Sequence, residues 1–115
     1  TLFRSVWSLL HNSGVRHALP AFFVAQQASY EQQFKNLSGK LVANGMPPSL
    51  WPDQEEISQT DYLIRQYTTD LHQNGPNTEL INTLLYLHRK KILLLERIAI
   101  EIQNEQKNEI ALITL

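Results

Sequence analysis

Cysteine is absent from this sequence, and the absence removes disulfide bonds, thiolate metal sites and cysteine nucleophiles together. Reducing and oxidising compartments both tolerate a cysteine-free chain, so this feature alone does not decide the compartment. Long apolar runs are missing too, since none approaches the ~18 residues that a membrane-spanning helix needs. No signal peptide is recognisable either. We therefore expect no membrane contact and take the cytoplasm as the expected location.

An excess of charge of one sign is also lacking, because 10 Lys and Arg residues face 11 Asp and Glu residues for a net charge of −1. Such a chain has no field that would attract a polyanion, and we expect no nucleic-acid partner. Apolar residues make up 43% of the 115 residues, which is enough to build one core and predicts a single folded domain over residues 1–115. A first residue other than Met suggests a fragment of a longer chain.

Helical periodicity marks two stretches in the first half of the chain. The first is a short helix over about Leu2–Leu10, stopped at Asn12–Gly14. The second helix is expected either to kink or to begin at Pro20, because proline is favoured in the first turn of a helix. Its apolar positions recur at steps of three and four as far as Leu41, and Asn44–Gly45 predicts an end with a left-handed cap.

The third helix follows a proline-rich connection, Pro47–Pro52. We expect Trp51 in this connection to fold over the open end of the helices as an apolar lid. Asp53 with Glu56 three residues later predicts a capping box at the start of the helix. Asn74–Pro76 predicts its end.

The last helix, capped by Asn77 or Thr78, carries a broad apolar face that predicts contact with two or more neighbours. Its apolar positions are Ile81, Leu84, Leu85, Ile92, Leu95, Ile98, Ala99 and Ile102. The pattern predicts an all-α fold, a four-helix up-down bundle with a short first helix and a long, central C-terminal helix.

The lengths of the helices carry the main functional expectation. The third helix spans about 31 Å, whereas an unbroken last helix from Thr78 to Leu115 spans about 57 Å and must overhang. The overhang begins with the polar stretch Gln103–Glu109 and ends in an apolar tail whose secondary structure the pattern leaves open. Because exposed aliphatic clusters call for a partner, we predict that the tail binds a protein, most simply another copy. The partner-binding residues of this prediction are Ile110, Leu112, Ile113 and Leu115.

Aromatic residues at helical spacing offer an alternative, in which the bundle binds a small ligand or metal in its interior. Plain core packing explains the same spacing. The candidate ligand-binding residues are Tyr30, Phe34, Tyr67 and His88.

The histidines invite a metal hypothesis, but the chain has no Glu-x-x-His step of the kind that di-metal helical bundles use. We therefore expect neither metal nor cofactor. His88 beside the basic run Arg89–Lys91 has the composition of a phosphoryl acceptor site. It also lies in the apolar register between Leu85 and Ile92, and a histidine packed at the core edge is the favoured interpretation.

Catalytic patterns are not found. Glu55 and Glu56 are explained by capping, and no serine has a nucleophile-elbow context. We expect no enzyme, and predict a non-enzymatic helical module that acts by protein contact in a regulatory, adaptor or assembly role.

Overall fold

The computed structural model describes residues 17–114, and within them the side chains of residues 17–109. Three α-helices and one short 3-10 turn make up this part of the chain: α2 (Ala21–Ala43), η1 (Pro48–Leu50), α3 (Gln54–Asn74) and α4 (Thr78–Thr114). The predicted all-α class and long last helix are confirmed. The predicted count of four helices is not, because the short helix expected over Leu2–Leu10 lies outside the described residues.

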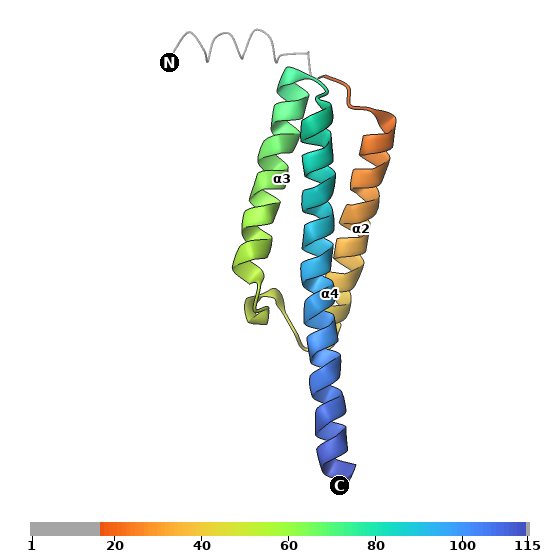
Figure 1. Ribbon diagram of the computed structural model, residues 1–115, viewed down its shortest axis with the longest axis vertical. Coiled ribbons are helices and arrows are strands. Elements are labelled where there is room, and N and C mark those ends of the chain that lie inside the picture. The colour runs from red at the N-terminus through yellow and green to blue at the C-terminus, as the bar shows by residue number, and fades with distance from the viewer. Residues whose placement is uncertain (1–16, 115) are drawn as a thin grey trace.

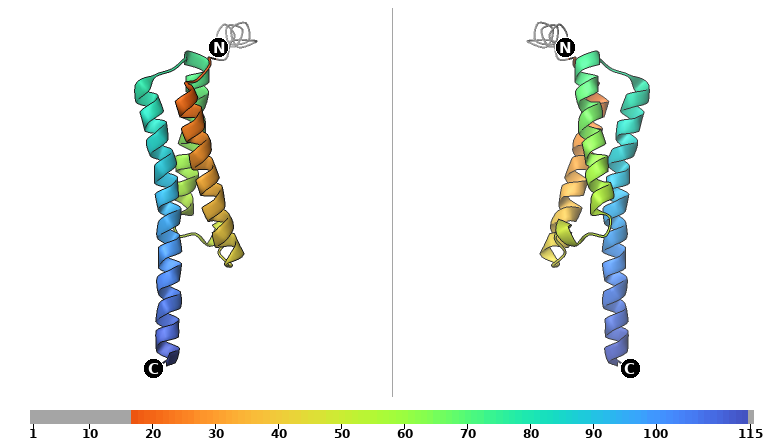
Figure 2. Two further views of the ribbon diagram at one scale, coloured as in Figure 1. Left: turned by 90° about the vertical axis from the view of Figure 1, so that its right-hand side faces the viewer. Right: turned by 90° about the vertical axis from the view of Figure 1, so that its left-hand side faces the viewer.

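The three helices run up and down, with α4 between the other two (Figure 1). Both α2 and α3 pack along the first part of α4 and lie on the same side of it (Figure 2). The lower part of α4 continues alone beyond the ends of its neighbours. The central position predicted for the last helix is therefore confirmed, and none of the described helices is long and apolar enough to cross a bilayer.

The inward faces of all three helices follow alternating steps of three and four residues, the spacing of a coiled coil. In α2 the positions at this spacing, all of them buried or half-buried, are Phe23, Gln27, Tyr30, Phe34, Leu37 and Leu41. In α3 they are Ile57, Thr60, Ile64, Tyr67 and Leu71. In α4 they are Ile81, Leu84, His88, Lys91, Leu95 and Ile98. The buried residues Leu87, Ile92 and Leu94 make the inward face of α4 wider than this line. This extra width is what allows α4 to contact two helices at once.

The apolar core is divided into two clusters along the helices. The upper cluster contains Phe23, Ile64, Leu71, Ile81, Leu84 and Leu87. The lower cluster contains Leu41, Trp51, Ile57, Leu94, Leu95 and Ile98. Trp51 is only 7% exposed and its Nε1–H donates to the carbonyl oxygen of Met46 at 2.9 Å, so the predicted apolar lid is confirmed.

The ends of α2 follow the sequence signals. Pro20 immediately precedes the first helical residue, so the chain makes a fresh start there rather than a kink. At the other end Gly45 has a φ of 82°, its N–H donates to the carbonyl of Val42 at 3.0 Å, and the N–H of Met46 donates to the carbonyl of Leu41 at 2.9 Å. This is a Schellman motif, and the predicted left-handed cap is confirmed.

The start of α3 differs from the prediction. The Asp53 side chain makes no capping hydrogen bond, and the Glu56 carboxylate lies 3.2 Å from the ammonium of Lys90 on α4. The expected capping box is therefore wrong, because an interhelical cation competes for its glutamate. At the start of α4 the cap is made by Asn77, whose Oδ1 accepts the N–H of Leu80 at 3.2 Å.

Two glycines, one at the end of α3 and one inside α2, provide a matched test of the assigned helix ends. Gly75 ends α3 with φ 91° and ψ 171°, a conformation that is nearly restricted to glycine, and Pro76 then prevents the helix from continuing. We expect Gly75→Ala to lower the free energy of unfolding by about 1–3 kcal/mol. Gly39 lies inside α2, where an added Cβ meets nothing within 4 Å apart from its chain neighbours and the backbone of its own helix, and Gly39→Ala should raise the free energy of unfolding by about 0.5–1 kcal/mol. Urea unfolding measures both, and destabilisation by both would contradict the assigned helix ends.

Candidate functional site

A layer of polar side chains separates the two apolar clusters, and all three helices contribute to it. This polar layer consists of Gln27, Tyr30, Asp61, Thr68, His88 and Lys91. The two α4 members occupy positions of its inward seam, where coiled coils usually place aliphatic residues. Polar groups buried in such a place need partners, and their partners define what the layer can do.

His88 is 4% exposed and contacts two residues of α2, Gln27 and Tyr30. Its Nε2 lies 3.2 Å from the amide nitrogen of Gln27, which also donates to the hydroxyl of Thr68 at 3.3 Å. The ring stacks on Tyr30 with a centroid separation of 6.1 Å and an interplanar angle of 17°. Because the amide nitrogen is a donor, the ring nitrogen that faces it must accept, and the contact favours a neutral imidazole.

The charge state of His88 agrees with this contact. The pKa of His88 is lowered from its usual 6.5 to about 4, mainly by burial and also by the positive charge of Lys91, and the carboxylate of Asp61 partly opposes both effects. The imidazole is therefore neutral at pH 7. A neutral imidazole has a nucleophilic nitrogen, but one that is only 4% exposed is poorly accessible to a phosphoryl donor, which favours the packing interpretation.

Lys91 is the second polar residue in the seam of α4 and is 9% exposed. Its ammonium lies 2.9 Å from Oδ1 of Asp61 on α3 and 4.1 Å from the ring centroid of Phe34 on α2. The ion pair and the cation–π contact together tie α4 to both neighbours. Asp61 also lies 3.5 Å from Nε of Arg65, so its carboxylate is shared between two cations.

At the edge of the layer, Arg89 donates to the Tyr30 hydroxyl at 3.3 Å. This hydrogen bond is the largest influence on the pKa of Tyr30 and holds it below its usual value; burial raises this pKa, whereas Gln26 and the Arg89 charge lower it. The donors and acceptors of the layer thus satisfy one another. Chemically, the layer can specify the register of three helices.

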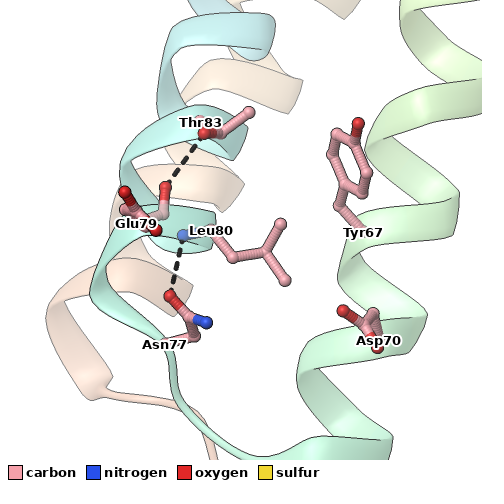
Figure 3. A pocket seen from close by; sticks show the side chains of 6 residues that line it. All are labelled: Tyr67, Asp70, Asn77, Glu79, Leu80 and Thr83. Atoms are coloured by element: carbon pink, nitrogen blue, oxygen red, sulfur yellow. Dashed lines mark hydrogen bonds between the residues drawn. The ribbon is translucent and has the colours of Figure 1, made fainter.

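Three of the four predicted ligand-binding residues, Tyr30, Phe34 and His88, come together in or beside the polar layer. They are occupied by contacts with one another and with Lys91. Tyr67 packs against the upper cluster instead. It lines a separate, open depression of about 350 Å³ between the end of α3 and the start of α4, with Asp70, Asn77, Glu79, Leu80 and Thr83 (Figure 3). Tyr30, Phe34 and His88 are not among the residues that line this depression.

The predicted partner-binding residues lie at the end of α4. This helix continues unbroken to Thr114, so Ile110, Leu112 and Ile113 are helical rather than part of a strand or a turn. Their side chains, and Leu115 altogether, lie outside the described residues. Ahead of them, Gln103–Glu109 is exposed throughout, as the polar sequence predicts.

Sequence reasoning missed four members of the polar layer: Gln27, Asp61, Thr68 and Lys91. A signal was present for Lys91, which falls at the same three- and four-residue steps as Leu84, His88 and Leu95. The basic run Arg89–Lys91 hides this signal, because a lysine among other cations is ordinarily expected in water. Within the described part of the chain, no three His, Asp or Glu side chains gather in a way that could hold a metal ion.

Comparison with known proteins gives no significant match: no family model, no curated protein and no solved structure matches this chain.

Proposed function

We propose that this chain is a non-enzymatic helical module that acts by protein contact, in a regulatory, adaptor or assembly role, and that it self-associates through the end of α4. The proposal places it in the cytoplasm, without metal or cofactor and without nucleic acid as a partner. One observation carries it: α4 has 37 residues, whereas α2 has 23 and α3 has 21. The surplus projects from the bundle as a single helix (Figure 1).

An isolated helical segment gains little from its own backbone hydrogen bonds in water, because most helical stability in proteins comes from packing an apolar face. The exposed residues Gln103–Glu109 make no such packing in the bundle. The apolar residues of the sequence return only after them, at Ile110, Leu112 and Ile113. Burial of each aliphatic side chain against a partner is worth ~1.5–3 kcal/mol, from which the entropy of association must be subtracted. These magnitudes favour a weak to moderate dimer.

The interior of the bundle supports contact rather than catalysis. His88 is neutral and enclosed, and Lys91 is neutralised by Asp61. Neither group is presented to a substrate in the described part of the chain. The interior-ligand alternative, with Tyr30, Phe34, Tyr67 and His88, is the second candidate.

Truncation after Gln106 tests this function. We expect the truncated chain to shift toward monomer while its cooperative unfolding is retained, because the removed residues lie beyond both apolar clusters. Sedimentation equilibrium measures the association and circular dichroism the helix content. A full-length variant with Ile110, Leu112, Ile113 and Leu115 all replaced by Gln keeps the length of the helix and should dissociate equally.

Two results would contradict the proposal. If the truncated chain unfolds, the tail belongs to the intramolecular core and the overhang has been misinterpreted. If the full-length chain stays monomeric at high micromolar concentration and binds nothing from its source extract, self-association fails and the interior-ligand alternative is favoured.

A further inference from the structure

A line of apolar side chains runs along the outward face of α4, opposite the seam that packs on α2 and α3. Tyr86, Leu93 and Ile100 are one heptad apart and so lie on one line of the helix. They are 63%, 56% and 57% exposed, respectively. Isolated exposed apolar residues are common, but three in register make an outer stripe that resembles the seam of a coiled coil.

The outer stripe is accessible to a large partner. Both α2 and α3 lie on the opposite side of α4, which forms one edge of the molecule in the side views (Figure 2). Two molecules can therefore bring their α4 helices together without a collision between their other described helices. We propose that the outer stripe binds a second copy of this chain, α4 against α4, in an antiparallel and two-fold symmetric pair. This inference rests on the proposed function in that the partner is again a second copy.

Charge complementarity argues for a second copy as the occupant. Arg89 and Glu96 are both exposed, lie on the same flank of the stripe and are placed on either side of Leu93. In an antiparallel pair centred at Leu93, Arg89 of each copy faces Glu96 of the other, so symmetry makes two ion pairs. On the opposite flank Arg97 faces Lys90 of the other copy, a like-charge contact that Glu56, 3.2 Å from Lys90, partly offsets.

Side-chain size and helix dipoles favour the antiparallel direction. Leu93 meets its own copy near the two-fold axis, and Tyr86 packs against Ile100 of the second copy at both ends. A parallel pair would stack tyrosine on tyrosine and would align two long helix dipoles unfavourably. Side chains at a two-fold interface count twice, so a change at Leu93 should have a large effect.

The central test is Leu93→Lys in the full-length chain, measured by sedimentation equilibrium. We expect the dissociation constant to rise about tenfold or more, since two lysines replace two leucines at the centre of the interface. Val42→Lys is the matched control, because Val42 is a 48% exposed apolar residue on α2, away from the outer stripe. It should leave the dissociation constant unchanged, and circular dichroism verifies that both variants fold.

A charge reversal tests the direction of the pair. Arg89→Glu should weaken association, and the double variant Arg89→Glu/Glu96→Arg should restore it. If Arg89→Glu strengthens association, the antiparallel pair is overturned. If Leu93→Lys leaves a dimer unchanged while truncation after Gln106 dissociates it, the tail is the interface and the stripe inference fails alone. If Leu93→Lys dissociates the dimer while truncation after Gln106 leaves it unchanged, the outer stripe is the interface and only the tail proposal fails. If the full-length chain is monomeric in every measurement, both proposals fail.

Discussion

Acidification from pH 7 to pH 4 should lower the free energy of unfolding of the unmodified chain by about 2–3 kcal/mol more than that of His88→Leu. His88 has a pKa of about 4 in the folded protein and about 6.5 when unfolded. Between these values the unfolded chain binds the proton and the folded chain does not, so acid favours unfolding. The contribution of neutral His88 to the free energy of unfolding is thus fully present above pH 6.5 and is lost as the pH falls toward 4.

At pH 7, His88→Leu should keep or raise the stability, because Gln27 retains its hydrogen bond to Thr68 and a leucine suits the seam. The measurement is urea unfolding at a series of pH values between 4 and 7. Because the unmodified chain and the His88→Leu variant differ only at this residue, the difference between their pH profiles isolates the contribution of His88. Identical pH profiles for the unmodified chain and His88→Leu would show that His88 is not the buried neutral group described above. Loss of a biological activity without a change in stability would instead favour a ligand or phosphoryl role.

Trp51→Ala should lower the free energy of unfolding by about 3–5 kcal/mol, whereas Leu50→Ala should change it by less than about 0.5 kcal/mol. The two residues are adjacent in sequence, but Trp51 is 7% exposed in the lower cluster and Leu50 is 59% exposed. Removal of the indole also leaves the carbonyl of Met46 without its donor at that position.

Chemical denaturation monitored by circular dichroism measures both variants, since the fluorescence of Trp51 is lost in one of them. A small effect of Trp51→Ala would mean that the lid does not close the lower end of the bundle. In that case the association tests above would need to be repeated, because an open lower cluster would itself be an apolar surface.

The tertiary structure alone decided which polar residues enter the core. From sequence, Lys91 belongs to a basic run and is expected in water, because an unpaired ammonium is costly to bury. It is buried because Asp61 and Phe34, from two other helices, reach it. The same kind of long-range competition removed Glu56 from its expected capping box, since Lys90 lies close enough to attract it. Such contacts depend on side chains far apart in the chain, and local spacing does not encode them.

The sequence by itself determined where the described helices begin and where α2 and α3 end, because those signals are local. Pro20 fixes a start through its restricted φ, and Gly45 and Gly75 fix ends through positive φ values that other residues avoid. It also determined the overhang of α4, since nothing after Asn77 breaks the helix. The stacking of Tyr30 on His88 came only with the tertiary structure, because the packing of α2 on α4 decides which aromatic residues meet.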